Sequence, residues 1–323
     1  MTSIVITGSV AFDYLMTFPG DFIEHVKPDK LNKLSLSFLV DEMRRQPGGC
    51  AANIAFNLAL LGERPIMMAT VGQDFGDYRA WLETHGVDTS ATVEIPEVFT
   101  ASFFVNTDRN QNQIASFYTG AMAYARDLSF HTLGFSVDLT IVSPNDPEAM
   151  RKYPAECKAL NIPYIYDPSQ QIVRMSGDDL REGVEGADIL IVNDYEFELL
   201  KDATGMSEAG VRDAVNRAVI ITRGEAGSTI WAGGDEITIP IVPPAQVLDP
   251  TGVGDAYRAG LIKGLVLGLP WQICGQIGAL AASYVLETHG PQTHTYTLAE
   301  FVGRYKAAFG EDGFVGLMKQ GRM

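Results

Sequence analysis

Short apolar runs alternate with amphipathic stretches along the first two thirds of the chain. Runs such as SIVITG and ADILIVN carry almost no polar residue, whereas CAANIAFNLALLG and YEFELLKDATG space their apolar residues as a helix does. Unbroken apolar strands that alternate with helices are typical of a parallel sheet covered on both faces. The pattern predicts an α/β fold with a doubly wound, mostly parallel sheet and helices on both faces. The predicted strands are 3–8, 65–72, 139–144, 162–168 and 187–193, and the predicted helices are 50–62, 77–86, 147–161, 177–186 and 195–205.

Two segments depart from this alternation, at about 14–45 and 98–119. The first contains LSLSFLV (34–40), which has the composition of a strand, and the second contains VFTASFFVNT and QIASFYTG on either side of the turn-rich DRNQN. We expect the two segments to form a small antiparallel β lid over the ligand-binding edge of the sheet. No long linker or repeat interrupts the sequence, so residues 1–323 are predicted to form a single domain.

Charge and cysteine content narrow the classes of function. Lys and Arg number 24 against 40 Asp and Glu, and the net charge of −16 repels a nucleic-acid backbone, so nucleic acid is excluded as a partner. A ligand that carries phosphate must therefore be held by backbone amides or by single basic residues. The three cysteines are widely spaced, and no apolar stretch approaches the roughly 20 residues of a membrane span. These features predict a cytoplasmic protein that does not bind membranes.

The segment DPTGVGDAYRAG (249–260) carries the candidate chemistry. Gly252 and Gly254 allow a sharp turn ahead of a helical pattern, which puts the amides of Gly252, Val253 and Gly254 at a helix N-terminus, where they form an anion hole. Asp255 lies inside this hole, and its carboxylate suits a general base that faces a substrate hydroxyl while the amides face a phosphoryl group. Asp255 could also be an ordinary first-turn residue that the helix dipole stabilises.

This segment resembles the C-terminal signature of the ribokinase-like (PfkB) family of sugar and nucleoside kinases, with Pro250 and Val253 in place of the commoner Thr and Ala. Four further stretches resemble motifs of that family in the same order: GSVAFD, PGGCAANIAFNLALLG, NDYE and TRGEAG. The resemblance covers essentially the whole chain. It implies a kinase that uses ATP and Mg²⁺, and it leaves open a monovalent cation such as K⁺.

Within the family, the chain is most similar to the bacterial ribokinase-like adenosine kinases. The similarity rests on LSLSFLVDE, QIASFYTGAM, NDPEAM, DPSQQ and the DPTGVGDAYRAG variant. It implies transfer of the γ-phosphoryl group to the 5′-hydroxyl of adenosine, giving AMP in purine salvage. The residues that the resemblance assigns to the ribose are Ser9, Asp13, Ser37, Gly49 and Asn53, with Phe103 and Phe117 clamping the purine and Gln170, Gln171 and Arg174 closing the substrate and phosphate side. Those assigned to the nucleotide are Asn193, Thr222, Arg223, Gly224 and Gly227, with Glu196 reaching the magnesium ion through water.

Other interpretations remain open on the sequence. Two phenylalanines favour a flat purine over a sugar, because aromatic faces stack, but Phe103 and Phe117 could also be packing residues of the lid strands. The acceptor could be another nucleoside or a sugar such as ribose or fructose, and a non-catalytic sensor on the same fold is a further class. A Rossmann oxidoreductase is disfavoured because GVGDAY lacks the third glycine. The open strand edges of the lid could pair with a second subunit in a homodimer.

Overall fold

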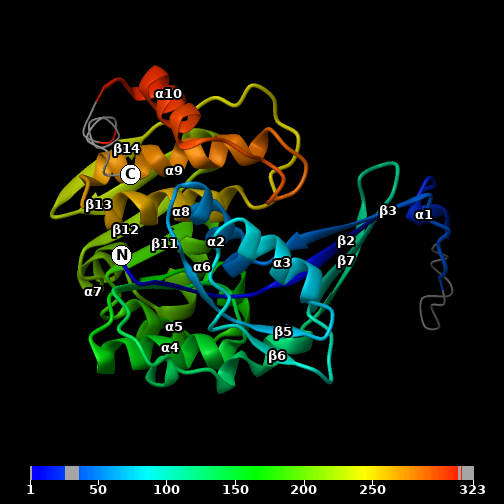
Figure 1. Cartoon of the computed structure of the whole chain (residues 1–323), viewed down its shortest axis with the longest axis horizontal. Helices are drawn as coiled ribbons and strands as arrows, with labels where there is room; N and C mark the ends of the chain where they lie inside the picture. The colour runs from blue at the N-terminus through cyan, green and yellow to red at the C-terminus, as the bar shows by residue number, and fades with distance from the viewer. Residues whose placement is uncertain (1, 26–35, 312–313, 315–323) are drawn as a thin grey trace.

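The computed structural model describes residues 2–25, 36–311 and 314, and its centre is an eight-stranded sheet (Figure 1). The strand order is β14-β13-β12-β11-β10-β9-β1-β4, and all pairs are parallel except the two at the β14 edge. The predicted mostly parallel sheet is thus confirmed. Its strands are β1 (Ile4–Thr7), β4 (Ile66–Met68), β9 (Leu139–Val142), β10 (Tyr164–Tyr166), β11 (Ile189–Asn193), β12 (Ala218–Thr222), β13 (Ser228–Ala232) and β14 (Asp235–Ile239).

Helices cover both faces of this sheet, as predicted. Successive residues of β1 point to opposite faces, so that Ile6 belongs to the core cluster that includes Phe56 of α2 and Val5 to the cluster that includes Tyr153 of α4. Burial on both faces explains the unbroken apolar character of the strands. The helices are α1 (Phe22–His25), α2 (Cys50–Leu60), α3 (Gly76–Thr84), α4 (Pro147–Leu160), α5 (Gly177–Val184), α6 (Asp194–Thr204), α7 (Glu208–Ala214), α8 (Val253–Val266), α9 (Trp271–Leu286) and α10 (Leu298–Phe309). Among the described residues, none of them has both the length and the apolarity needed to cross a membrane.

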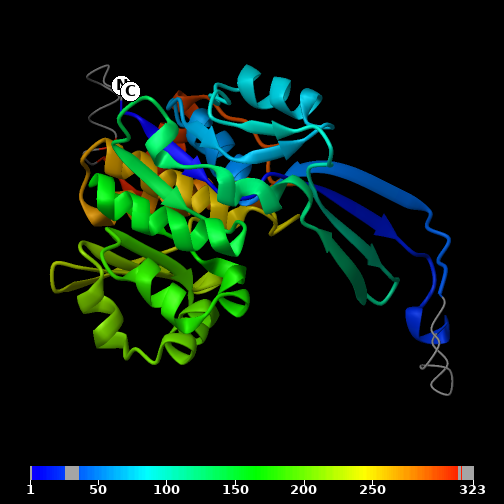
Figure 2. The same cartoon turned by 90° about the horizontal axis from the view of Figure 1, so that it is seen from below.

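A second, four-stranded sheet extends away from the main body (Figure 2). Its order is β3-β2-β7-β8, with β3 (Glu42–Gly48), β2 (Ala11–Thr17), β7 (Ala101–Thr107) and β8 (Gln113–Tyr118). The two outer pairs are antiparallel and the central pair, β2 with β7, is parallel. The small antiparallel sheet expected from the two inserted segments is confirmed, with a parallel junction where the segments meet. We call this sheet the lid.

Two predicted strands are wrong in detail. Residues 36–40 of the run expected at 34–40 have no regular structure, and residues 34 and 35 lie outside the described part of the chain. Phe38 instead packs on Phe18 and Phe22, with ring centroids 5.0 and 4.8 Å apart. The strand that pairs with β2 is β3, whose sequence EMRRQPG has no apolar alternation because its first four residues are exposed.

The second error concerns the single strand expected at 65–72. The chain leaves the main sheet after Met68, and β5 (Thr70–Gly72) pairs with β6 (Val93–Ile95) in a separate two-stranded sheet. At this change of direction, Thr70 Oγ1 donates a hydrogen bond to the carbonyl of Ala121, 2.7 Å away. The apolar run continues through the break, so the hydrophobic pattern alone did not reveal it.

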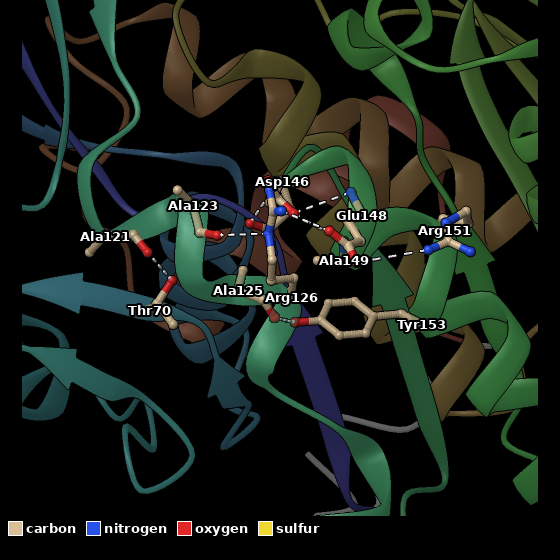
Figure 3. A network of polar contacts seen from close by, with 11 residues as sticks. Thr70, Ala121, Ala123, Ala125, Arg126, Asp146, Glu148, Ala149, Arg151 and Tyr153 are labelled. Atoms are coloured by element: carbon tan, nitrogen blue, oxygen red, sulfur yellow. Dashed lines mark hydrogen bonds and ion pairs between the residues drawn. The ribbon is translucent and has the colours of Figure 1, made fainter.

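Several polar contacts fix the segment after the lid to the core, and Arg126 makes two of them (Figure 3). Arg126, in the 3₁₀ helix Gly120–Asp127, donates from Nη2 to Asp146 at 2.6 Å and from Nη1 to Glu148 at 2.7 Å. Asp146 also caps α4 by accepting from the amides of Glu148 and Ala149. The NDPEAM stretch therefore joins the base of the lid to the carboxyl edge of β9.

Candidate active site

The site is built around the N-terminus of α8, where Gly252 has a φ of 80°. A Cβ at Gly252 would lie 2.4 Å from the side chain of Pro291, so this position requires glycine on both conformational and steric grounds. Asp249 holds the preceding loop, because its carboxylate accepts from the amides of Thr251 and Gly290, each at 2.9 Å. The loop therefore presents the first turn of α8 in a fixed orientation.

The predicted anion hole needs one refinement. The amide of Val253 donates to the carbonyl of Pro250 at 3.3 Å, so that group is already engaged. The first amides of a helix have no intrahelical acceptor, which leaves those of Gly252, Gly254 and Asp255 as candidate donors. Together with the helix dipole, they make this end of α8 attractive to an anion.

Asp255 belongs to a hydrogen-bond network that begins on α2. Asn53 donates from Nδ2 to Oδ2 of Asp255 at 2.8 Å and accepts on Oδ1 from Nε2 of Gln292 at 2.9 Å. The same Nε2 of Gln292 donates to the hydroxyl of Tyr78, which donates in turn to the carbonyl of Gly48 at 3.0 Å. Asn53, Tyr78 and Gln292 are buried, so the network holds the carboxylate of Asp255 from below.

The surroundings of Asp255 suit a base. Burial raises its pKa, while the charge of Arg258 and the hydrogen bond from Asn53 lower it, and the net result is a pKa above the ordinary aspartate value. A carboxylate with a raised pKa binds a proton more readily at neutral pH than an exposed one.

A second carboxylate, that of Asp13, lies where the lid joins the core. Its Oδ2 occupies the space that a Cβ on Gly48 would fill, at 2.7 Å. Burial and the negative charge of Asp249 raise its pKa to about 6, against a hydrogen bond with Gln46 that lowers it. Asp13 is therefore an acceptor held in a partly desolvated position.

The register of the lid puts three of the predicted substrate residues, Asp13, Phe103 and Phe117, in one row. Asp13 is paired with Gln46 on β3 and with Phe103 on β7, and Phe103 is paired with Phe117 on β8. Side chains of directly paired residues lie on the same face of a sheet. The two phenylalanines therefore share a face with Asp13, and Phe117 keeps 45% of its surface exposed.

Ser9 and Gly49 shape the start of α2. Ser9 Oγ accepts from the amide of Cys50 at 3.1 Å, and the Ser9 carbonyl accepts from the amide of Ala51. Gly49 has a φ of 95°, and a Cβ there would lie 2.6 Å from backbone atoms of Ser9 and Ala11. The glycine thus lets the β1–β2 turn approach the N-terminus of α2, next to Asn53.

The structure does not bring Ser37 to this group. Ser37 is exposed, and its neighbour Phe38 packs on Phe22 of α1. In both views α1 lies at the far end of the lid, away from α8 (Figures 1 and 2).

The DPSQQ stretch follows β10 and contributes a buried ion pair. Asp167 meets Arg258 of α8 through two contacts of 2.5 Å, Oδ2 to Nε and Oδ1 to Nη2. Beyond it, Gln170 and Arg174 are exposed, whereas Gln171 is buried and its Oε1 has no hydrogen-bond partner in the described part of the chain. An unsatisfied buried acceptor next to a candidate site is suited to receive a donor from a ligand.

The NDYE motif forms a helix cap. Asn193 Oδ1 accepts from the amide of Glu196 at 2.7 Å, and Glu196 Oε2 accepts from the amide of Asn193 at 2.8 Å, which is a capping box at the start of α6. Glu196 Oε1 also accepts from Ser169 at 2.9 Å. Both carboxylate oxygens already have partners, so Glu196 suits a water-mediated contact to a metal ion better than direct ligation.

No group of three or more metal-ligating side chains is gathered among residues 2–25, 36–311 and 314. Magnesium nevertheless fits the donor set, because this ion keeps several waters and takes its remaining ligands from one or two carboxylates and substrate phosphates.

The TRGEAG stretch forms a tight turn between β12 and β13. Gly224 has a φ of 52° and Gly227 a φ of 81°, and a Cβ on Gly227 would lie 2.1 Å from the carbonyl of Ile239. Arg223 is hydrogen-bonded through Nη1 to Thr229, and Thr222 ends β12. The turn lies at the carboxyl edge of β12, next to the start of α6 at the end of β11.

Six residues of the site had no role assigned to them from the sequence: Gln46, Tyr78, Asp167, Asp249, Arg258 and Gln292. Arg258 left a detectable signal, because it and Lys263 are the two basic residues of a helical stretch that is otherwise mostly apolar. Tyr78 and Gln292 reach the site from α3 and from the loop after α9, and nothing local in the sequence indicates that contact.

Comparisons with known proteins indicate the family of this chain. The model of the pfkB family of carbohydrate kinases matches residues 4–297. The nucleoside kinase of Methanocaldococcus jannaschii is 30% identical over 94% of this chain and 97% of its own. The nucleoside kinase of Burkholderia thailandensis, solved in complex with inosine, is 38% identical with a TM-score of 0.85, over 96% of this chain and 99% of that one. The ribokinase of Arabidopsis thaliana, complexed with ribose and ATP, is 20% identical with a TM-score of 0.77 over 95% and 99% of the two chains, and shows the fold alone.

The family model spans the lid, the network around Asp255 and the helix that follows it. This protein is therefore a phosphotransferase with an alcohol group as acceptor, and it belongs to the pfkB family of carbohydrate kinases.

Proposed function

We propose that this protein is an ATP-dependent nucleoside kinase that phosphorylates the 5′-hydroxyl of adenosine, giving AMP and ADP in purine salvage. The observation that carries the proposal is the row formed by Asp13, Phe103 and Phe117 on one face of the lid. A hydroxyl acceptor and two aromatic faces in line suit a ligand that joins a ribose to a flat base.

The reaction follows from the position of Asp255. Its carboxylate takes the proton of the 5′-hydroxyl, the oxygen forms a bond to the γ-phosphorus, and the bond from that phosphorus to the β,γ-bridging oxygen breaks to release ADP. The amides at the start of α8 stabilise the charge on the moving phosphoryl group. Asn53 keeps the base in place through its 2.8 Å hydrogen bond.

The remaining polar groups are distributed between the ribose and the nucleotide. Asp13, Gly49 and Asn53 are assigned to the ribose hydroxyls together with Ser9, and Gln171 is assigned to a donor on the substrate and phosphate side. The nucleotide is assigned to Asn193 and to the turn 222–227. Glu196 would hold a magnesium ion through water, and the bound ion would neutralise phosphate charge.

The lid supports two further parts of the proposal. Its closure over the nucleoside would exclude water, which competes with the 5′-hydroxyl as acceptor. Its outer strands, β3 and β8, have open edges, and Met43 and Ile114 on the face opposite Asp13 are exposed. Such an edge and face suit a homodimer formed through the lid. The three free cysteines are consistent with a reducing, cytoplasmic setting.

A second acceptor is favoured by a specific comparison. The relative from Burkholderia was solved in complex with inosine and in complex with ADP-inosine. Inosine has the ribose and fused rings of adenosine and differs at the exocyclic group of the purine. We therefore include inosine as an alternative acceptor at the same site.

The test is a panel of acceptors with magnesium ATP. ADP release is measured with adenosine, inosine, guanosine, cytidine, ribose and fructose at equal concentrations, and kcat/KM is compared. Adenosine is expected to give the highest value, followed by inosine. A higher kcat/KM for ribose or fructose than for every nucleoside would overturn the nucleoside proposal, and a preference for cytidine would overturn the purine part of it.

A further inference from the structure

Arg258 is a buried cation directly behind the anion hole. It lies on α8 one turn after Gly254, and only 7% of its surface is exposed. The carboxylate of Asp167 lies 2.5 Å from two of its three guanidinium nitrogens: Oδ1 accepts a hydrogen bond from Nη2, whereas the contact of Oδ2 with Nε is an ion pair without hydrogen-bond geometry. The hydrogen bond and the ion pair together orient the guanidinium group.

The third nitrogen, Nη1, faces the loop. A Cβ built on Gly254 would lie 2.7 Å from Nη1, and Gly254 itself is exposed at the start of the helix. Within the described part of the chain, Nη1 has no hydrogen-bond partner. A guanidinium nitrogen without a partner in the protein keeps its donors available to a ligand at the N-terminus of α8.

The charges around Arg258 show why a cation is needed there. Burial lowers its pKa, but Asp167 and Asp255 outweigh burial and raise the pKa above the ordinary arginine value, so the group stays charged. Glu196 adds a third negative charge to the same surroundings. A polyphosphate brought to three carboxylates would be repelled, and the protein's net charge of −16 increases that repulsion.

A purely structural role explains less of this geometry. An ion pair that only joins β10 to α8 has no need of a free Nη1 at the glycine loop. The same helix offers such a structural pair for comparison: Lys263, also buried, meets Glu63 at 2.6 Å, several turns away from the loop. The two pairs differ mainly in position: the Arg258–Asp167 pair lies beside the glycine loop, and the Lys263–Glu63 pair does not.

We propose that Arg258 is a catalytic residue whose Nη1 donates to the transferring phosphoryl group, and that Asp167 is the positioning residue that aims it. The inference rests on the proposed phosphoryl transfer beside Asp255, and not on which nucleoside is the acceptor. As the γ-phosphoryl group leaves the β,γ-bridging oxygen and bonds to the acceptor oxygen, negative charge spreads over its equatorial oxygens. Arg258 and the amides of the hole stabilise that charge together.

The experiment compares Arg258→Gln with Lys263→Met, which breaks the other buried ion pair of α8. Each purified variant and the unaltered protein are assayed with the best acceptor of the panel above, and melting temperatures are recorded. We expect Arg258→Gln to lower kcat by about 10²–10³-fold, as the loss of an anion-hole donor does, with an unchanged KM for the nucleoside. Lys263→Met is expected to lower the melting temperature while leaving kcat unchanged.

Arg258→Lys keeps the experiment informative if the glutamine variant does not fold. The probe is ADP with aluminium fluoride and the acceptor, which mimics the planar phosphoryl group, and the readout is the rise in melting temperature over ADP and acceptor alone. The unaltered protein should show the rise and Arg258→Lys should lose it, with Asp167→Asn intermediate. An equal rise in Arg258→Lys, an unchanged kcat in Arg258→Gln, or an equal loss of kcat in Lys263→Met would overturn the proposal. Absence of adenosine turnover in the unaltered protein, with another nucleoside accepted, would instead count against the acceptor alone.

Discussion

Asn53 donates a hydrogen bond from Nδ2 to Oδ2 of Asp255, and the network behind Asn53 determines which end of its amide faces the aspartate. The hydroxyl of Tyr78 gives its one proton to the carbonyl of Gly48, so it must accept from Gln292. Gln292 therefore presents Nε2, which also donates to Oδ1 of Asn53. Asn53 is left with its amino group toward Asp255, where it favours the ionised carboxylate.

Replacing Gln292 by glutamate should change the pKa of Asp255, although residue 292 does not contact Asp255 directly. A carboxylate at 292 turns the donor into an acceptor, so Asn53 is expected to rotate its amide and present Oδ1 to Asp255. The pKa of Asp255, already raised by burial, should rise further, and the acid limb of the kcat profile should move to higher pH. Loss of one hydrogen bond to a charged group predicts a fall in kcat of about 10-fold or more near neutral pH.

The control for this change is Gln292→Met, which fills the space without an acceptor. It should shift the acid limb less than Gln292→Glu does. Superimposable pH profiles for Gln292→Glu and the unaltered protein would show that the orientation of Asn53 does not control Asp255.

Asp13 is expected to lower the stability of the folded protein and to strengthen ligand binding. Its pKa of about 6 in the folded protein lies above the unfolded value of 3.8, so ionisation of Asp13 disfavours folding. This penalty is absent below about pH 4, grows as the pH rises through 6, and then amounts to at most about 3 kcal/mol. Asp13→Asn is therefore expected to unfold at a higher temperature than the unaltered protein at pH 8, with the difference shrinking toward pH 5, and to bind adenosine more weakly.

Asp249 is the matched carboxylate for comparison, because its pKa shifts in the opposite direction to that of Asp13. Burial raises its pKa, but hydrogen bonds from Thr251 and Gly290 outweigh burial and lower the pKa below the ordinary value. Asp249→Asn should therefore lower the melting temperature at pH 8. If thermal denaturation gave Asp13→Asn a lower melting temperature than the unaltered protein at pH 8, the account of Asp13 as a strained, desolvated charge would fail.

The lid supplies a matched pair of phenylalanines that test the purine clamp. Phe103 shares a face with Asp13, whereas Phe104 lies on the opposite face and stacks on Tyr14 with centroids 4.7 Å apart. Phe103→Ala should raise the KM for adenosine by about 10-fold, since stacking of a base on an aromatic ring contributes about 1–3 kcal/mol. Phe104→Ala should leave that KM unchanged. Equal effects of the two substitutions on KM would assign both rings to packing.

The sequence was sufficient for those parts of the site that local chemistry determines. The turn at Gly252, the helix that begins after it and the acid at 255 all follow from a dozen consecutive residues, and the parallel core follows from strands such as Ile4–Thr7, buried on both faces. The strand Glu42–Gly48 was missed because its residues pair through their backbones while their side chains face solvent. The links through Gln292 and Arg258 were missed because each joins segments far apart in sequence.

The most direct test of the account is the rate of AMP formation from adenosine and magnesium ATP by the unaltered protein and by Asp255→Asn, with the phosphorylated position identified by NMR. Asparagine keeps the shape of the side chain but cannot accept the proton, so the account predicts 5′-AMP from the unaltered protein and a loss of about 10²–10⁴-fold in the variant, with adenosine binding retained. Equal rates of AMP formation by both proteins, or phosphate on a hydroxyl other than the 5′, would contradict it.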